Sequence, residues 1–412
     1  MATTAMVTTA TATLDVPDLP QPATESPTPM STTLATLSNA QIRLAARPLG
    51  LPVASDWQLT QEPVTEPADG GVLVQVLAIS LDPAMRGWMN EGKSYIPPVG
   101  IGEVMRAGGV GRVIASRNAA YAVGDMVAGG PGVQSYWSVP AERVARELSK
   151  IDLNQGSITQ WLNVLGMPGM TAYFGLLDVG QPQAGQTVVV SGAAGAVGQT
   201  VGQLAKLKGC RVVGIAGGQT KCDWVVRELG FDACIDYKAP RPGGPLTAAD
   251  APQSPPEGGG QLGSGPSLTP DGAKRWDAVR EGLRQHCPAG VDVYFDNVGG
   301  EILDAVLAKI TRKARIVICG AISQYNAMSA IAGPKNYMSL LVNRARMEGM
   351  VVFDYTARFP EAIAEMAGYL KTGKMTSKED VVQGSVADFP ATLLKLFSGE
   401  NFGKLVLQLA AE

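Results

Sequence analysis

The pattern of apolar and polar positions is most regular between residues 187 and 216. Residues 188–190 are all valine, the apolar and β-branched run expected of a strand buried on both faces. Apolar residues then recur at helical spacing, at Val197, Val201, Leu204 and Ala205. The helix is expected to end at Lys208 and Gly209, and Arg211–Ala216 follows as a second apolar strand. The pattern therefore predicts a strand, a helix and a parallel strand, which is the βαβ unit of an α/β protein.

A glycine turn lies where the period changes from strand to helix. Residues 191–198 read Ser-Gly-Ala-Ala-Gly-Ala-Val-Gly, with Ala193 in place of the first glycine of the G-x-G-x-x-G fingerprint. A glycine lets the backbone approach a phosphate, and the following helix N-terminus supplies free N–H groups. The turn therefore predicts a dinucleotide site, and a purely structural glycine turn is the alternative. The residues expected to hold the pyrophosphate are Gly195, Ala196, Val197 and Gly198.

The end of the second strand bears on which dinucleotide binds. An NAD site usually has Asp or Glu there, to bond the ribose 2′-hydroxyl, whereas this chain continues Gly-Gly-Gln-Thr-Lys at 217–221. Lys221 would place a positive charge beside a 2′-phosphate, so the predicted cofactor is NADPH. A solvated surface lysine is the alternative interpretation of Lys221.

Strands and helices continue to alternate downstream. Strands are expected at residues 233–237, 291–297, 315–319 and 347–353, and helices at 276–285 and 303–310. This alternation predicts a doubly wound parallel sheet, in which ligands bind at the carboxyl ends of the strands. The loops at 297–300 and 320–325 follow two of those ends, so their polar groups are site candidates.

The upstream part of the chain has a different pattern. Residues 40 to about 160 hold short β-rich segments, such as 71–78 and 110–115, separated by Gly, Pro and Asp turns. That pattern predicts a β-barrel-like domain. A last strand at 404–409 has no helix after it and is expected to pair back into this first domain.

Composition limits the function classes. The chain has 412 residues, 45% of them hydrophobic, and a net charge of −3, which suits two packed domains and gives no basic excess for nucleic acid or anionic lipid. No apolar run is long enough for a transmembrane span, and no secretory signal pattern is found. The expected location is the cytoplasm.

Two segments are predicted to be disordered. Residues 1–38 are rich in Ala, Thr, Ser and Pro and contain no Lys or Arg, which also disfavours a transit peptide. Residues 240 to about 273 are dominated by Pro, Gly and Ser, as in a surface-loop insertion.

Histidine and cysteine usage excludes several chemistries. The five cysteines show no C-x-x-C spacing, and His286 is the only histidine. We therefore expect no zinc site and no other metal site. Ser-His-Asp and Cys-His catalysis are disfavoured as well, because His286 lies near the end of a predicted helix, beside a Pro-Ala-Gly loop.

Several stretches resemble a known family. They are Leu-Asp-Pro-Ala-Met-Arg-Gly at 81–87, Ile-Gly-Glu-Val-Met at 101–105, Gly-Met-Pro-Gly-Met-Thr-Ala-Tyr-Phe-Gly-Leu at 166–176, the glycine turn, Tyr-Phe-Asp-Asn-Val-Gly-Gly at 294–300, Ile-Ser-Gln-Tyr-Asn at 322–326 and Arg-Met-Glu-Gly at 346–349. The chain is similar to the zinc-independent medium-chain dehydrogenase/reductase branch that includes leukotriene B4 12-hydroxydehydrogenase/prostaglandin reductase, plant alkenal double-bond reductases and bacterial curcumin reductase. The resemblance covers nearly everything from about residue 40 onward except the insertion.

The resemblance implies an α/β fold with a GroES-like β-barrel catalytic domain and a Rossmann NADPH-binding domain. The expected boundaries are a tail at 1–38, a GroES-like domain at 39–161 completed by 367–412, and a Rossmann domain at 162–366. A homodimer is also implied. Two departures from the family motif Asp-Pro-Tyr-Met-Arg-Gly-Arg are Ala84 and Trp88, and Val342 aligns with a substrate-side tyrosine of the mammalian enzymes.

The resemblance also implies roles for individual residues. Lys221 and Tyr237 are expected to contact the 2′-phosphate, and Arg86 and Tyr337 are assigned to the substrate side. Further cofactor contacts are implied for Asn297, Cys319, Gly320, Ala321, Ile322, Ser323, Gln324, Tyr325, Met350, Val351, Val352 and Asn401.

The implied activity is NADPH-dependent reduction of the carbon–carbon double bond of α,β-unsaturated aldehydes and ketones, with hydride delivered to the β-carbon and no metal. A hydroxyl donor would then stabilise the enolate, and Tyr325 is the candidate for that catalytic role. A tyrosine that only packs on the cofactor is the alternative for Tyr325. For the whole chain, the alternatives are an NADPH quinone oxidoreductase and a non-catalytic NADPH-binding protein.

Overall fold

The computed structural model describes Met1, residues 34–239 and residues 270–409. Most of the predicted tail and of the predicted insertion lies outside these ranges. Their inner edges differ from the prediction: a short 3₁₀ turn forms at Leu34–Thr36, strand β1 begins at Ser38, and helix α7 (Pro270–His286) begins before residue 276. Pro at a first helical position suits a helix start, because it lacks an N–H that would have no partner there. The domain boundaries themselves stay predictions.

A six-stranded parallel sheet forms the nucleotide-binding half, as predicted. Its order is β10-β9-β8-β11-β12-β13, and every neighbouring pair is parallel. The strands are β8 (Thr187–Ser191), β9 (Arg211–Ala216), β10 (Ala233–Asp236), β11 (Val291–Asp296), β12 (Ile310–Ile318) and β13 (Arg346–Gly349).

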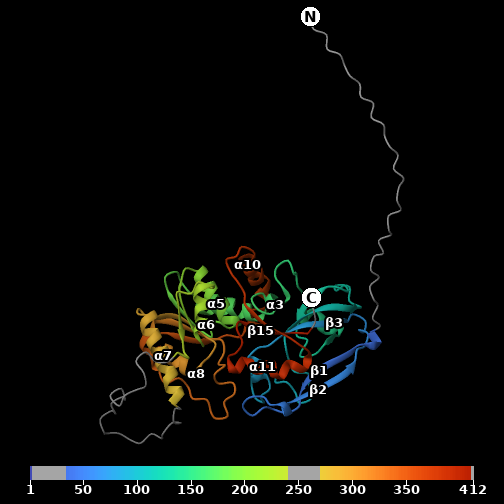
Figure 1. Ribbon diagram of the computed structural model, residues 1–412, viewed down its shortest axis with the longest axis horizontal. Helices are drawn as coiled ribbons and strands as arrows, with labels where there is room; N and C mark the ends of the chain where they lie inside the picture. The colour runs from blue at the N-terminus through green and yellow to red at the C-terminus, as the bar shows by residue number, and fades with distance from the viewer. Residues whose placement is uncertain (2–33, 240–269, 410–412) are drawn as a thin grey trace.

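The central strand β8 explains why the sheet is covered on both faces. Val188 and Val190 belong to one buried cluster, with side chains of α4 (Met167–Phe174), α5 (Ala196–Leu207) and α6 (Gln219–Arg227). Val189 points the other way, into a cluster with α7 and α8 (Gly300–Leu307). Alternate side chains of one strand therefore anchor two helix layers, which Figure 1 shows around the sheet.

Three expected elements differ in their bounds. The helix expected at 303–310 is α8, which ends at Leu307, and the strand expected at 315–319 starts already at Ile310. The β11–β12 register shifts near Val291, and Lys313 has φ 62°, so an irregularity interrupts the strand pattern that sequence periodicity relies on. The strand expected at 347–353 ends at Gly349, and a 3₁₀ turn follows at Val352–Arg358.

The other half is a seven-stranded sheet with its own core. Its order is β14-β15-β3-β4-β5-β7, β6 pairs with β3, and β1 and β2 form a separate hairpin. The strands are β1 (Ser38–Leu44), β2 (Trp57–Pro63), β3 (Val72–Ser80), β4 (Gly109–Ser116), β5 (Met126–Gly129), β6 (Tyr136–Val139), β7 (Leu148–Lys150), β14 (Glu379–Gln383) and β15 (Lys404–Gln408). The C-terminal strand β15 pairs antiparallel with β3, so the chain returns to the barrel as expected.

The remaining helices lie within the two halves or between them. Within the barrel half are α1 (Ala84–Trp88) and α2 (Ala141–Glu147), and α9 (Met338–Asn343) lies between β12 and β13. Between β7 and β8 the chain forms α3 (Ile158–Trp161), α4 and a π-helical turn η3 (Gly175–Gly180). Between β13 and β15 it forms α10 (Phe359–Lys371) and α11 (Phe389–Ser398). Figure 1 shows β15 and α11 at the middle of the molecule, between the helices α5–α8 and the strands β1–β3.

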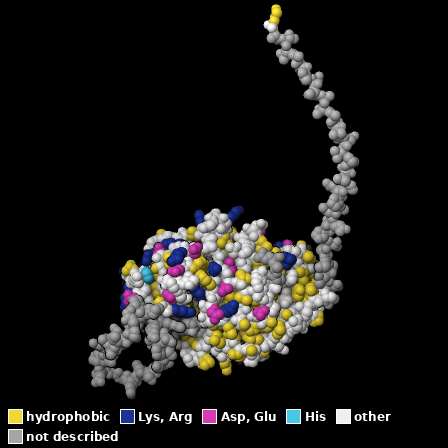
Figure 2. Space-filling model, in the orientation of Figure 1, with side chains coloured by type: hydrophobic (Ala, Val, Ile, Leu, Met, Phe, Trp, Pro, Cys, Tyr) yellow, Lys and Arg dark blue, Asp and Glu magenta, His cyan; other side chains and the backbone are white. Residues whose placement is uncertain are grey.

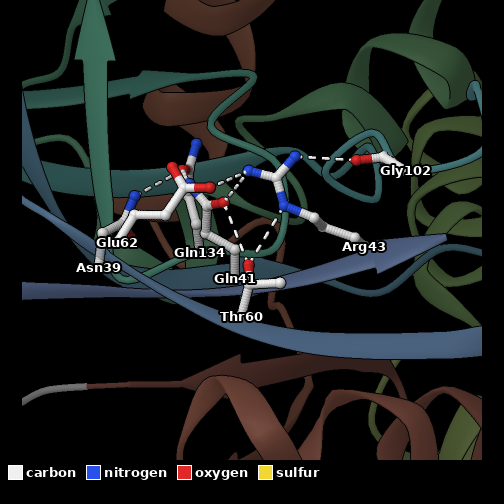
Figure 3. A network of polar contacts seen from close by, with 7 residues as sticks. All are labelled: Asn39, Gln41, Arg43, Thr60, Glu62, Gly102 and Gln134. Carbon is white, nitrogen blue, oxygen red and sulfur yellow. Dashed lines mark hydrogen bonds and ion pairs between the residues drawn. The ribbon is translucent and has the colours of Figure 1, made fainter. Parts of the chain in front are cut away.

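A polar network fixes the barrel loop that follows residue 100. Arg43 of β1 donates from Nη1 to the Gly102 carbonyl at 2.8 Å and from Nη2 to Glu62 of β2 at 2.6 Å (Figure 3). Gln41 and Gln134 are hydrogen-bonded beside it. These contacts tie the loop to the β1–β2 hairpin.

The surface carries charges of both signs. Figure 2 shows Lys and Arg interspersed with Asp and Glu on the face drawn, and hydrophobic side chains gathered toward the barrel end. In the described part of the chain, no helix has both the length and the apolar character needed to cross a membrane.

Candidate functional site

A cleft of about 1900 Å³ lies between the two sheets. The loops after β8, β9, β11 and β12 line one wall, and α1 with the barrel loops lines the other. Most of the sequence-predicted site residues line it together: Gly195, Ala196, Val197, Gly198, Lys221, Tyr237, Asn297, Cys319, Gly320, Ile322, Ser323, Gln324, Tyr325, Met350, Val351, Val352 and Asn401.

The glycine turn lies at the carboxyl end of β8, where the strand order changes direction. β9 extends the sheet on one side of β8 and β11 on the other, which is the place where open α/β sheets bind ligands. A Cβ at Gly198 would lie 2.2 Å from the Gly192 carbonyl oxygen, so no other residue fits this packing of α5 on the turn. Helix α5 begins at Ala196, and residues 195–198 line the cleft. The first N–H groups of a helix have no partner within it, so they are available to an anion there.

The returning strand is joined directly to this turn. Gly403 bridges Gly195, and the Gly403 N–H donates to the Ala194 carbonyl at 3.1 Å. The glycine turn is thereby held beside the first residue of β15, which belongs to the barrel sheet.

Two lysines lie close together beyond the end of β9. Lys221 donates from Nζ to the Gly399 carbonyl at 2.8 Å, and burial, followed by the nearby Lys238, lowers its pKa. Gly217 lies beneath Tyr237 and Lys238: a Cβ there would be 2.7 Å from the Tyr237 hydroxyl and 3.0 Å from Lys238 Cε. Like charges held this close favour an anion between them, so the corner fits a 2′-phosphate. Sequence reasoning stopped at Tyr237 and missed Lys238, the next residue.

Asp296 organises the loops that follow β8 and β11. Its Oδ1 accepts hydrogen bonds from the Ser191 hydroxyl at 3.0 Å and from the Val298 and Gly299 N–H groups. Asn297 then donates to the Ser191 carbonyl at 2.7 Å, which orients it beside the glycine turn. Asp296 is fully buried, and burial raises its pKa. As the last residue of an apolar strand, it carried no sequence signal of this positioning role.

Tyr325 lies deep in the same cleft. Its hydroxyl accepts a hydrogen bond from the Ala321 N–H at 3.0 Å, which leaves its own proton to be donated. Burial raises the pKa of Tyr325, so the hydroxyl keeps its proton at neutral pH. Ala321 acts through this N–H and does not line the cleft itself.

The barrel wall contributes groups that were not predicted as site residues. Lys404, 1% exposed, donates from Nζ to Asp82 Oδ1 and to the Leu81 carbonyl, each at 2.6 Å. This ion pair, in which the lysine is buried and the carboxylate partly exposed, joins β15 to the segment before α1. Trp88, Tyr95 and Arg106 lie further along the same wall.

The two residues assigned to the substrate side lie elsewhere. Arg86 is buried, and its guanidinium donates to the Pro48 and Gly50 carbonyls at 2.9 and 2.7 Å. Tyr337 is 58% exposed, and neither residue lines the cleft. Arg86 therefore has a structural role in the barrel. The positions of Arg86 and Tyr337 do not support the predicted substrate contacts, which stay predictions.

Within residues 34–239 and 270–409, no three His, Cys, Asp or Glu side chains cluster in a way that could hold a metal ion. The carbonyl of His286 accepts a hydrogen bond from Arg211, at the end of α7 and away from the cleft.

A parallel sheet with a glycine turn at its switch point, facing a β-barrel across a cleft, is the architecture of a two-domain dinucleotide-binding protein. Residues 40–146 match the family described as the N-terminal domain of oxidoreductase. The NADPH-dependent curcumin reductase of Escherichia coli is 39% identical, over 90% of this chain and 96% of that protein. The NADP(+)-dependent 2-alkenal reductase of Nicotiana tabacum is 36% identical, over 91% and 99%. The solved structure of CurA from Vibrio vulnificus in complex with NADPH is 41% identical, with a TM-score of 0.76. The match covers 90% of this chain and 100% of that one.

The chain therefore belongs to the zinc-independent branch of the medium-chain dehydrogenase/reductase family. The recognised resemblance and the fold class, a GroES-like barrel with a Rossmann sheet, are confirmed.

Proposed function

We propose that the chain is a reductase that uses NADPH to reduce the carbon–carbon double bond of α,β-unsaturated aldehydes and ketones. The observation that carries the proposal is the Tyr325 hydroxyl, a protonated donor in the same cleft as the glycine turn. The substrates in the names of the relatives, curcumin and 2-alkenals, support this choice of substrate class.

The general class of the enzyme is established more firmly than its substrate. The relatives are NADP-dependent oxidoreductases, and several act on carbon–carbon double bonds, so the predicted enzyme class and the predicted cofactor, NADP(H), are confirmed.

The residues that line the cleft suit such a cofactor. The turn at 195–198 would hold the pyrophosphate, and Lys221, Tyr237 and Lys238 would hold the 2′-phosphate. Further cofactor contacts are proposed for Asn297, residues 319–325, residues 350–352 and Asn401, all of which line the cleft except Ala321. When bound, NADPH supplies the hydride for the β-carbon of the substrate.

Tyr325 would stabilise the negative charge that hydride transfer leaves on the substrate. As negative charge builds on the substrate carbonyl oxygen, the hydroxyl donates a hydrogen bond to it, and the Ala321 N–H strengthens that donation by bonding the phenol oxygen. The enolate carbon then takes a proton from solvent or from the hydroxyl.

Replacing Tyr325 tests its chemical role. We expect Tyr325→Phe to lower kcat for a 2-alkenal about tenfold, because one hydrogen bond to a developing charge is lost. The affinity for NADPH should change little. Tyr121→Phe is the matched control, since its hydroxyl bonds the Leu148 carbonyl outside the cleft. An unchanged kcat for Tyr325→Phe would assign Tyr325 to cofactor packing only.

Replacing Lys221 tests the 2′-phosphate corner. Lys221→Ser should weaken NADPH binding about tenfold and leave NADH binding unchanged, because an ammonium–phosphate hydrogen bond is lost. Calorimetric titration with both nucleotides measures the effect. Lys206→Ser is the control, since Lys206 pairs with Asp232 away from the cleft. An equal loss of affinity for NADH and NADPH would contradict this assignment.

The substrate proposal is tested by NADPH consumption with short 2-alkenals, aryl enones and quinones. Turnover of quinones alone would favour an NADPH quinone oxidoreductase. Tight NADPH binding without turnover of any acceptor would favour a non-catalytic binding protein. The homodimeric state and the cytoplasmic location are further proposals, which rest on the family resemblance and on composition.

A further inference from the structure

Both departures from the family motif lie on one wall of the cleft. Ala84 stands where the motif has tyrosine, Trp88 stands where it has arginine, and both residues line the cleft. The motif therefore brings no phenol to this wall. Tyr95, from the loop that follows α1, lines the same wall and supplies one.

Trp88 holds the Tyr95 hydroxyl in place. The Trp88 Nε1–H donates to the Tyr95 oxygen at 3.2 Å. Because the oxygen accepts this hydrogen bond, the hydroxyl proton stays free for another acceptor. The Tyr95 ring centre lies 6.4 Å from that of Phe353, which belongs to the 3₁₀ turn on the sheet side of the cleft. Tyr95 thus reaches from the barrel wall to the side where the cofactor is proposed to bind.

A cation lies beside this hydroxyl. Arg106 lines the same wall, its Cζ lies 5.6 Å from the centre of the Trp88 ring, and it interacts electrostatically with Tyr95. Its Nη1 donates to the Pro97 carbonyl at 2.9 Å. A fixed positive charge stabilises a nearby phenolate, which is the form that Tyr95 takes after giving up its proton.

The backbone that carries Arg106 is held firmly. The Met105 N–H donates to the Ile42 carbonyl at 2.8 Å, and Met105 is fully buried. The preceding loop is fixed at Gly102 by Arg43 (Figure 3). The cation is therefore positioned before any substrate arrives.

Tyr95 and Tyr325 lie in one cleft but differ in their access to water. They interact electrostatically with each other, and both line the cleft. Tyr95 is 55% exposed, whereas burial is the main influence on the hydroxyl of Tyr325. A group that gives up a proton in every turnover must recover one from solvent, and Tyr95 is the better placed of the two to do so.

We propose that Tyr95 is a second catalytic residue, which donates the proton that the α-carbon of the substrate takes up. This inference rests on the proposed function and identifies the proton source of that reaction. Tyr325 keeps its separate role as the hydrogen-bond donor to the carbonyl oxygen.

The proton transfer balances as follows. Once the β-carbon has received the hydride, the electron pair of the former double bond is held by the enolate. That pair forms the new C–H bond with the Tyr95 proton, and the carbonyl double bond is restored. The O–H bonding pair stays on the Tyr95 oxygen, beside Arg106. The phenolate then takes a proton from water, so each turnover consumes one proton from solvent.

The test uses a 2-methyl-2-alkenal, because its α-carbon becomes chiral when it is protonated. Wild type should form one enantiomer in excess, since a fixed donor delivers the proton to one face. Tyr95→Phe keeps the ring and removes the hydroxyl. We expect kcat to fall about tenfold, with water replacing part of the lost function, and the product to be close to racemic. The product is analysed before its α-carbon exchanges in buffer.

Single-turnover kinetics separates the two tyrosines. With enzyme in excess, the oxidation of NADPH reports hydride transfer alone. It should keep its wild-type rate in Tyr95→Phe and be slowed in Tyr325→Phe. Tyr121→Phe is the matched control, because its hydroxyl lies outside the cleft and bonds the Leu148 carbonyl. It should leave kcat and the enantiomer ratio unchanged.

Three results would overturn this inference while the proposed function stands. They are a racemic product from wild type, an unchanged kcat in Tyr95→Phe, and a lower kcat with an unchanged enantiomer ratio, which would leave Tyr95 as a positioning residue only. Absence of any reduction of 2-alkenals by wild type would contradict the proposed function itself.

Discussion

Gly198→Ala is expected to weaken NADPH binding about a hundredfold, because overpacking that must shift backbone costs up to about 3 kcal/mol. The added Cβ would lie 2.2 Å from the Gly192 carbonyl oxygen and 2.8 Å from Ala193 Cα. Both neighbours are backbone atoms of the turn itself, so neither can rotate away. Either the turn or the start of α5 must move, and the phosphate-binding N–H groups move with it.

Calorimetric titration of the variant with NADPH measures this loss. Gly368→Ala is the matched control: it lies in helix α10, has open space where a Cβ would be, and should bind NADPH like wild type. Circular dichroism of both variants separates a local loss of binding from loss of the fold. A Kd for Gly198→Ala equal to that of the control would contradict the placement of the cofactor at this turn.

Lys404→Met is expected to destabilise the protein by about 2 kcal/mol, because the buried ammonium loses its hydrogen bonds to a carboxylate and a carbonyl, and both acceptors lose their donor. Lys404 is 1% exposed and bonds both Asp82 and the Leu81 carbonyl. Asp82 also accepts from the Ser80 hydroxyl at 2.5 Å, so the pair joins β15, the end of β3 and the start of α1. Burial lowers the pKa of Lys404, and Asp82 opposes this effect.

Denaturant unfolding of a double-mutant cycle checks the prediction. Asp82→Asn alone should also destabilise, since it leaves the Lys404 ammonium buried without its counter-charge. The double variant Asp82→Asn/Lys404→Met should be more stable than the sum of the two losses predicts. Additive losses, or single losses near zero, would show that the pair does not hold the cleft wall together.

The nucleotide-binding half was the more predictable part of the chain. Its strands and helices follow local periodicity, and the turn at 195–198 joins neighbouring elements, so the sequence places its residues in order. The predicted bounds were wrong where an irregular backbone interrupts the local pattern. In β12 the irregularity near Lys313 breaks the alternation, so the first residues of that strand were not predicted.

The barrel side of the cleft was much harder to predict. Arg86 and Arg106 are both arginines in the barrel half, yet the fold turns one onto the Pro48 and Gly50 carbonyls and leaves the other in the cleft. That difference depends on loops distant in sequence. The same holds for Lys404, whose carboxylate partner is Asp82 at the other end of the chain. Residues joined by long-range contacts leave no periodic signal.

Reduction of the carbon–carbon double bond is the central claim, and product analysis tests it most directly. The protein is mixed with NADPH and a 2-alkenal, the decrease in NADPH is followed, and the product is identified by mass spectrometry and NMR. We predict the saturated aldehyde in equal amount to the NADPH oxidised, and much slower turnover with NADH. An unsaturated alcohol as product, or oxidation of NADPH with quinones only, would contradict the account.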